Sequence, residues 1–299
     1  PMRALPAYLH GLSRVVVDEA VFDSPVARRV SQRLPHLTAE VLPEGETLSS
    51  GPAGEEVLYL KRYKGRFLRH CPGTSHYRCC GYQIIHIGEN CPLRCSYCIL
   101  QAYFHDRVLK VWANQDDLWS ELDQAFAENP DRRYRVGTGE FTDSLVLEAL
   151  TGYSRDLIAF LGRYPQVCLE LKSKVVDLSW MDVVRDPSKV LPAWSMNAPA
   201  IAEHEEQGEC ASLEERLAAA RTCAQAGFRV CLHFDPMIHF PGWQDGYART
   251  VEMIFDHLRP EQIAYVSMGS FRHMPDLKRS INENFPESKY IYGEFITGL

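Results

Sequence analysis

Short apolar runs rich in β-branched residues alternate with helical segments along most of this chain. Between residues 82 and 285 there are six such runs, each followed by a helical pattern or by a polar loop. Parallel strands that are buried on both faces have this composition, and helical crossovers connect them. Six units are more than an open nucleotide-binding sheet needs and fewer than the eight of a full barrel. The sequence therefore predicts an α/β fold, a partial (β/α)6 TIM-type barrel with an N-terminal extension.

The predicted strands and helices divide the chain at about residue 80. Residues 1–80 form the extension that packs on the barrel, and within it "LSRVVVDEAVFDSPVARRVSQRL" predicts a short strand and then a helix. Residues 81–299 form the barrel, and "KYIYGEFI" predicts a final C-terminal strand. The clearest helix covers 212–227, where Ser212 and Glu215 form a capping box and Gly227 ends the helix. The six barrel strands are expected in "YQIIHIG", "RYRVGTG", "QVCLELKSK", "VLPAWSMN", "FRVCLHFDP" and "QIAYVSMGS".

Composition and charge restrict the class of protein. Hydrophobic residues make up 45% and charged residues 24%, which is typical of a globular protein, and no apolar run approaches the roughly 18 residues of a membrane span. No export signal is evident, so we expect a cytoplasmic protein with no membrane partner. Ten cysteines in such a chain indicate reduced thiols and metal binding. The net charge of −7 means that any nucleic-acid contact must come from a local patch.

The segment "GENCPLRCSYCILQAYF", residues 88–104, contains Cys91, Cys95 and Cys98 in the spacing C-x3-C-x2-C. Thiolates are ligands for zinc and for iron–sulfur clusters. A closed structural zinc site needs a fourth ligand, which Cys71, Cys79, Cys80 or a histidine could supply. A cubane iron–sulfur cluster held by three cysteines instead leaves one iron open to a small ligand. The three thiols alone leave both alternatives open.

Polar residues follow the predicted strands at the barrel end where catalytic residues gather in such folds. They occur in every unit after the cysteine loop. These residues are Gly137, Gly139 and Glu140 after the second strand, Lys172 and Lys174 after the third, Ser195 and Asn197 after the fourth, His233 and Asp235 after the fifth, and Ser270 and Arg272 after the sixth.

The spacing of the cysteines, in a loop after the first barrel strand, resembles the motif of the radical S-adenosylmethionine superfamily. "CSYCILQAY" further resembles the cysteine loop of the spore photoproduct lyase family, also called DNA repair photolyases. Five more blocks resemble that family in the same order, so the likeness covers about residues 80–295. The blocks are "SKVVDL", "WSMNAP", "AAARTCAQAGFRV", "PMIHFPGWQDGY" and "FRHMPDLKRSI".

This resemblance implies a function. The family has a partial (β/α)6 barrel, an open [4Fe-4S] cluster and S-adenosyl-L-methionine, which is cleaved to a 5′-deoxyadenosyl radical. Its lyase members use this radical to return a covalent thymine dimer in DNA, the spore photoproduct, to two thymines. The implied partners are DNA and an external one-electron reductant of the flavodoxin or ferredoxin type.

The resemblance also implies roles for single residues. Cys91, Cys95 and Cys98 match the cluster ligands, and Tyr97 matches a tyrosine implicated in hydrogen transfer. Lys174 and Ser195 match residues that contact S-adenosylmethionine, and "GTGE" resembles the Gly-Gly-Glu stretch that binds its amino group. The remaining expected site residues are Gly137, Gly139, Glu140 and Asn197 for the cofactor, and His233, Asp235, Arg272, Lys278 and Arg279 for the substrate.

Two positions depart from the family pattern. The cysteine that gives a hydrogen atom to the product radical falls at Glu140 or Phe141 here, and the second tyrosine of the loop is Ile99. Either another donor replaces the thiol, with Cys71, Cys79 and Cys80 as candidates, or the reaction differs and acts on RNA or a small molecule. An alternative of another class is a zinc-stabilised nucleic-acid-binding protein without catalysis.

Two further features lie outside the quoted blocks. Cys210 lies in an acidic loop and is expected to be a bystander. The basic residues between Lys61 and Arg69, with Tyr63 and Phe67, are either a site for a phosphate backbone with aromatic stacking or a solvated strand face.

Overall fold

The computed structural model describes residues 4–48, 56–71, 80–104 and 106–296. Cys79 therefore lies outside the described residues. The chain forms two compact units, and the predicted division into 1–80 and 81–299 stays a prediction. The first unit comprises Pro1–Pro92, Asp106–Ser173 and Asp177–Leu191, and the second comprises Leu93–His105, Lys174–Val176 and Pro192–Leu299.

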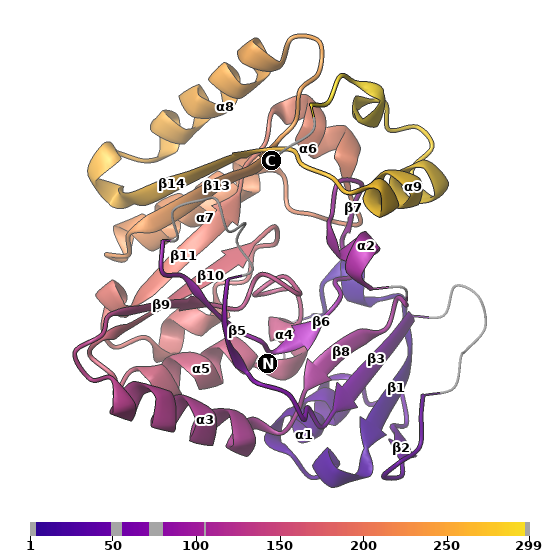
Figure 1. The fold of residues 1–299 in the computed structure, drawn as a ribbon. Coiled ribbons are helices and arrows are strands. Elements are labelled where there is room, and N and C mark those ends of the chain that lie inside the picture. Colours follow the sequence, from indigo (N-terminus) through magenta and orange to yellow (C-terminus); the bar gives the residue numbers. More distant parts are fainter. Residues whose placement is uncertain (1–3, 49–55, 72–79, 105, 297–299) are drawn as a thin grey trace. The chain divides into compact units, whose positions relative to one another are not determined.

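The first unit contains a five-stranded sheet with the order β2-β1-β3-β8-β6 (Figure 1). β1 to β3 and β8 are parallel, and β6 is antiparallel to β8. The predicted strand and helix of the extension are confirmed as β1 and α1, and Ser24 caps the helix by accepting a hydrogen bond from the Ala27 amide. The elements are β1 (Leu12–Asp18), α1 (Pro25–Arg33), β2 (Glu40–Leu42), β3 (Glu56–Lys61), β6 (Gly88–Glu89) and β8 (Leu109–Trp112).

The first unit also contains the strands β4, β5, β9 and β10. β5, β9 and β10 are parallel, whereas β4 is antiparallel to β5. Gly152 adopts a left-handed conformation with φ +60° and separates α4 from α5. The elements are β4 (Leu68–His70), β5 (Gln83–Ile85), α3 (Gln115–Glu128), β9 (Tyr134–Gly137), α4 (Glu148–Thr151), α5 (Tyr153–Leu161) and β10 (Val167–Ser173).

The second unit contains the parallel strands β11, β13 and β14, so all six predicted barrel strands are present. The capping box of Ser212 and Glu215 at α7 is confirmed. Figure 1 shows α8 beside β13 and β14. The elements are β7 (Arg94–Cys95), α2 (Leu100–Tyr103), β11 (Val190–Ser195), α6 (Pro199–Glu205), β12 (Glu206–Gln207), α7 (Leu213–Gln225), β13 (Val230–Met237), α8 (Trp243–His257), β14 (Ile263–Ser270) and α9 (Pro275–Asn284).

The strand predicted in "KYIYGEFI" is wrong, because the segment forms a 3-10 turn at Tyr290–Tyr292. Tyr290 and Ile291 are adjacent and both buried. A turn can bury two neighbouring side chains on one side, whereas a strand would direct them to opposite faces. The Tyr290 hydroxyl also lies 3.1 Å from the Ser96 Oγ, which fixes the turn on the cysteine loop.

Within the described part of the chain, we find no helix of the length and apolar character needed to cross a membrane.

Candidate functional site

Tyr97, which lies between two cysteines of the loop, is held by a buried ion pair. Its side chain is 6% exposed, and its hydroxyl donates a hydrogen bond to the Oε1 of Glu206. The other carboxylate oxygen of Glu206 accepts from the guanidinium of Arg216. Arg216 also donates to the carbonyl oxygen of Ser195 at 2.9 Å. The phenol is therefore fixed by residues of the second unit that come from β12 and α7.

The local geometry that places Glu206 comes from a two-residue antiparallel ladder. β12 pairs with β7, so that Glu206 lies opposite Cys95. Gly208 follows with φ +78°, and a Cβ on it would lie 2.6 Å from the amide nitrogen of Arg94. Only glycine therefore allows the chain to turn this close to the cysteine loop. The neighbouring Glu205 accepts a hydrogen bond from the Ser96 Oγ at 2.6 Å.

Charges around the phenol determine its protonation. Burial, together with the Glu206 carboxylate and Cys95, raises the pKa of Tyr97 well above its usual value. The Lys174 ammonium lies 5.5 Å from the centre of the Tyr97 ring. Burial lowers the pKa of Lys174, but Cys95 and Glu206 raise it more, and the net effect is an increase. The site therefore combines a protonated phenol with a lysine cation.

Cys210 contacts the cysteine loop, so its expected role as a bystander is wrong. Its Sγ lies 3.9 Å from the Sγ of Cys95 and 3.4 Å from the carbonyl oxygen of Gln207. The hydrogen bond from Cys210, aided by Lys174 and opposed by burial, lowers the pKa of Cys95. The same hydrogen bond, together with burial, raises the pKa of Cys210. Cys95 is therefore the more acidic thiol of this pair.

The metal-binding role of the loop has support from its donor chemistry. Cys95 is buried and favours the thiolate, the form that iron–sulfur clusters bind, while Cys91 and Cys98 are half-buried. Cys91 belongs to the first unit, and Cys95 and Cys98 belong to the second. In the described ranges, no three His, Cys, Asp or Glu side chains lie close enough together to hold a metal ion. The donor types fit a cluster, and the ligand set stays a prediction.

The residues after β9 are packed within the first unit. A Cβ on Gly137 would clash with the hydroxyl of Tyr82, and one on Gly139 would lie 3.1 Å from the Lys172 Cβ. Glu140 accepts from the Lys172 Nζ at 3.0 Å, and both side chains are partly exposed. The ring of Phe141, the other position that aligns with the missing thiol, lies 4.6 Å from the ring of His86. Glu140 therefore forms an ion pair with Lys172, and the role of Glu140 in cofactor binding stays a prediction.

The two predicted cofactor residues of β11 have different surroundings. Ser195 is 8% exposed and pairs with His233 of β13. The fully buried Asn197 uses its Oδ1 to accept from the Tyr247 hydroxyl at 2.6 Å and from the Ala198 amide at 3.1 Å. These bonds support a structural role for Asn197, which holds α8 against the end of β11.

The predicted substrate residues are brought together only in part. Asp235 and Arg272 form an exposed ion pair with 4.0 Å between Oδ1 and Nη2. The nearby His233 is buried, and its Nε2 lies 3.4 Å from the Tyr265 hydroxyl. On α9, Arg279 pairs with Asp276 at 3.0 Å, while the Lys278 Nζ lies 5.8 Å from the ring centre of Tyr292.

The aromatic residues of the basic segment between Lys61 and Arg69 are packed inside the first unit. Tyr63 stacks on Trp112 with 4.7 Å between ring centroids, and Phe67 is 2% exposed. Tyr63 also accepts a hydrogen bond from Arg69. The hypothesis that these rings stack on bases is therefore wrong, since their faces are occupied.

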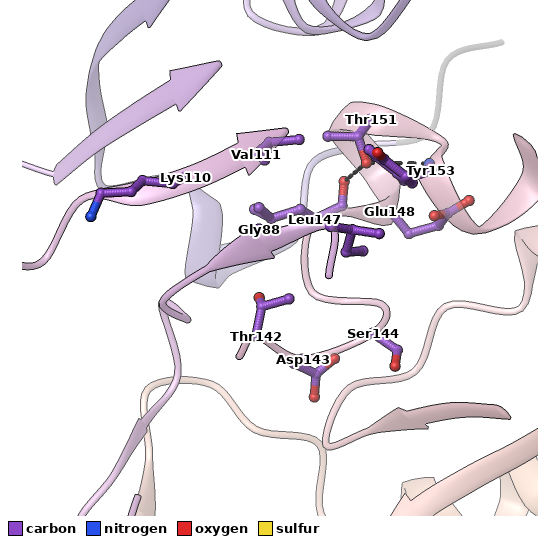
Figure 2. Close-up of a pocket in the computed structure, with 11 residues that line it drawn as sticks. Gly88, Lys110, Val111, Thr142, Asp143, Ser144, Leu147, Glu148, Thr151 and Tyr153 are labelled. Carbon is purple, nitrogen blue, oxygen red and sulfur yellow. Dashed lines mark hydrogen bonds between the residues drawn. The ribbon is translucent and has the colours of Figure 1, made fainter. Parts of the chain in front are cut away.

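A small cavity lies in the first unit between β6, β8 and the segment that follows β9 (Figure 2). Its volume is about 20 Å³, which is enough for a single water molecule and too small for a cofactor. Figure 2 shows Thr142, Asp143 and Glu148 among the residues that line it. Burial raises the pKa of Glu148 to about 7, although its carboxylate accepts from the backbone amides of Ser154 and Arg155 at the start of α5.

Comparison with known proteins gives the family of the chain. The sequence profile of the spore photoproduct lyase family matches residues 76–294, which is more than half of the chain. The chain belongs to the spore photoproduct lyase family. This confirms the family that the cysteine loop and the later blocks predict.

Characterised members of the family are similar at low identity. The spore photoproduct lyase of a Geobacillus species is 23% identical over 208 residues, which cover 69% of this chain and 61% of the relative. The spore photoproduct lyase of Bacillus subtilis is 22% identical over 209 residues, which cover 69% of this chain and 60% of the relative. The chain thus spans about three fifths of the length of these relatives.

Solved structures of spore photoproduct lyase share the fold. A double mutant with bound AdoMet and dinucleoside spore photoproduct matches with a TM-score of 0.81 at 18% identity, covering 93% of this chain and 85% of that one. The enzyme complexed with dinucleoside spore photoproduct matches with a TM-score of 0.80 at 18% identity, covering 93% and 84%. These matches confirm the predicted α/β partial barrel.

We predict that Glu206→Gln destabilises the protein by about 3–5 kcal/mol, because it leaves the Arg216 guanidinium buried without a charged partner. Chemical denaturation of the wild type and the variant measures this. Replacing both residues, as Glu206→Gln with Arg216→Met, should cost less than the sum of the single changes, since neither member of the pair is then left buried without its partner. Strictly additive losses would contradict the paired role of these residues.

We predict that stability falls as the pH rises from about 4.5 to 7, because of Glu148. Its pKa is raised to about 7 in the folded state, so the unfolded chain loses this proton first and folding becomes less favourable across that window. The expected loss is on the order of 3 kcal/mol. Urea denaturation at several pH values should show a flatter profile for Glu148→Gln, whereas Glu128→Gln on the surface of α3 should keep the wild-type slope.

Proposed function

We propose that this protein is a radical S-adenosylmethionine lyase that acts on a thymine lesion of the spore photoproduct type in DNA. Membership of the family and the names of its relatives support this activity. AdoMet and a dinucleoside spore photoproduct are bound in a solved structure with the same fold. The observation that carries the proposal is the position of Tyr97, held by Glu206 between two of the three predicted cluster cysteines.

In this proposal, Cys91, Cys95 and Cys98 hold a [4Fe-4S] cluster with one open iron. When bound, the cluster supplies the electron that cleaves S-adenosylmethionine to a 5′-deoxyadenosyl radical. Lys174 supplies a cation that can bind the carboxylate of the cofactor, and its raised pKa keeps it charged. Glu140 supplies an acceptor for the amino group, and Gly137 and Gly139 let the chain pass close to Tyr82 and Lys172.

The phenol of Tyr97 is suited to pass on a hydrogen atom. Its raised pKa keeps the O–H bond intact at neutral pH, and only the protonated phenol can give a hydrogen atom. Breaking that bond delivers the hydrogen atom to a substrate radical and leaves a tyrosyl radical beside Glu206, which one electron from the external reductant and one proton return to the phenol. The fixed hydrogen bond to Glu206 holds the ring in one orientation, and Glu206 is itself held by a hydrogen bond from the Arg216 guanidinium.

Positive side chains of the second unit are suited to a phosphate backbone. Arg272 and Arg279 have side chains that are 59% and 66% exposed, and among the described residues each pairs with one exposed carboxylate. Pairs of this kind contribute little stability, so phosphates can replace their carboxylates. We propose that Arg272, Lys278 and Arg279 contact DNA, while His233 and Asp235 lie toward the lesion. An external one-electron reductant of the flavodoxin or ferredoxin type completes the set of partners.

A different radical reaction, on RNA or a small molecule, is the second candidate function. The observation that favours it is the pair formed by Glu140 with Lys172, at the position where the lyases carry a hydrogen-donating thiol. A carboxylate is a poor hydrogen-atom donor, and Phe141 is no better. The test below distinguishes the two functions and also the zinc-stabilised alternative.

We predict that the protein, purified without oxygen and reconstituted with iron and sulfide, produces 5′-deoxyadenosine when S-adenosylmethionine and a reductant are added. DNA that carries the spore photoproduct should release repaired thymine, measured by mass spectrometry, and undamaged DNA should not. Deoxyadenosine without repair would favour the second function. A colourless protein with one zinc would contradict both.

The matched control for this experiment is a pair of cysteine variants. Cys91→Ala should lose the iron and the deoxyadenosine, whereas Cys80→Ala, at an exposed cysteine, should keep both. Unchanged iron content in Cys91→Ala would show that the cluster ligands are assigned incorrectly.

We predict that Tyr97→Phe keeps the cluster and the cleavage of S-adenosylmethionine but lowers repair at least tenfold, because the ring remains and the hydroxyl is lost. Tyr103→Phe, on α2 of the same loop and 49% exposed, is the control and should repair normally. The ratio of thymine to deoxyadenosine measures the effect, and an equal ratio in both variants would exclude Tyr97 from hydrogen transfer.

A further inference from the structure

A second, much larger cavity lies in the first unit, on the five-stranded sheet. Its volume is about 900 Å³. Cavities that bind small molecules commonly measure about 300–1,000 Å³. The residues that line it come from β3, from the segments that follow β1, β2 and β3, and from the start of β8. The predicted cluster, cofactor and substrate residues are not among them.

The position of the cavity follows a rule for parallel sheets. From β1, which lies between β2 and β3, the chain goes first to β2 on one side and then to β3 on the other (Figure 1). Such a reversal leaves a crevice outside the carboxyl ends of the strands, and ligands of α/β proteins bind there. Asp18 ends β1 and Lys61 ends β3, and both side chains line the cavity.

The floor of the cavity is apolar and aromatic. Leu42, Val57 and Tyr59 line it and belong to one buried cluster, against which Leu48 and Val108 pack. The Tyr59 hydroxyl donates to Asp18, which also accepts from the Arg62 amide at 2.8 Å, so the ring is held in place. A flat ring system fits against such side chains, because its faces bury apolar surface.

Cations gather at the carboxyl end of β3. The Lys61 Nζ lies 5.7 Å from the ring centre of Tyr59. The Arg62 side chain, 47% exposed, is 3.8 Å from Asp117, and the Lys64 side chain, 75% exposed, is 3.7 Å from Glu44. Exposed pairs at these distances are weak, so an anion can replace the carboxylates. These three cations lie within four residues of sequence, and they line the cavity together with the apolar side chains. They can therefore bind an anion.

Carboxylates also line the cavity, among them the exposed Glu19 and Glu46. Carboxylates accept hydrogen bonds from hydroxyl groups, as the acidic residue does for ribose in dinucleotide-binding folds. A ligand that carries an anion, a flat ring and hydroxyl groups would match the cations, the apolar side chains and the carboxylates together.

We propose that this cavity binds a nucleoside monophosphate, with the phosphate at Lys61, Arg62 and Lys64 and the base against the apolar residues of the lining. The site is separate from the cysteine loop and does not depend on radical chemistry. Its test therefore requires neither cluster nor lesion, and it can fail while the proposed function holds.

Isothermal titration calorimetry of the full chain tests the proposal. Adenosine 5′-monophosphate and thymidine 5′-monophosphate should both bind, and adenosine or inorganic phosphate alone should bind at least tenfold more weakly. Saturating S-adenosylmethionine should leave the affinity for the monophosphates unchanged. No binding, displacement by S-adenosylmethionine, or tighter binding of a short oligonucleotide than of either monophosphate would overturn the proposal.

Charge reversal locates the site. Lys61→Glu with Arg62→Glu should weaken monophosphate binding at least tenfold. The matched control is Arg133→Glu with Arg221→Glu, two exposed arginines that do not line the cavity, and it should bind as the wild type does. Equal affinity of the two double variants would overturn the assignment.

A larger side chain in the cavity provides a second, independent test of the site. Val108→Trp should reduce monophosphate binding at least tenfold, because the indole occupies the space of the base. Val41→Trp is the control, since Val41 is 43% exposed on β2 and does not line the cavity. Circular dichroism confirms that both variants fold, and normal binding by Val108→Trp would place the ligand elsewhere.

Discussion

The buried ion pair between Glu206 and Arg216 is the interaction on which the site of the second unit depends. Moving two charges out of water costs several kcal/mol per ion, and only close geometry with further hydrogen bonds offsets that cost. Here Glu206 also accepts from Tyr97, and Arg216 also donates to the carbonyl oxygen of Ser195. The pair thereby joins the cysteine loop, β11 and α7. A buried hydrogen-bond network of this kind rigidifies the side chains that it joins.

Features that depend on residues close together in the sequence could be predicted. The six barrel strands and the capping box of Ser212 depend on neighbouring residues, so pattern alone identifies them. The cysteine spacing is local as well, and with the later sequence blocks it indicates the spore photoproduct lyase family. The five-stranded sheet was harder to predict, because β6 and β8 are only two and four residues long and are defined by pairing with each other and with β3.

Features that depend on distant partners could not be predicted. Glu206 is 109 residues from Tyr97, and Cys210 is 115 residues from Cys95, so no window of sequence contains both members. The segment "HEEQGEC" contains three acidic residues and a glycine, which are equally typical of a solvated turn. The C-terminal segment was misread for the same reason, since Tyr290 is buried by its contact with Ser96.

These long separations also set an order of events during synthesis. The cysteines of the loop leave the ribosome early, but the residue that anchors Tyr97 is made more than a hundred residues later. Until β12 has emerged, the loop has neither its ladder with that strand nor its carboxylate anchor. A nascent chain that stalls before Glu206 would therefore carry the cysteines without the structure that organises them.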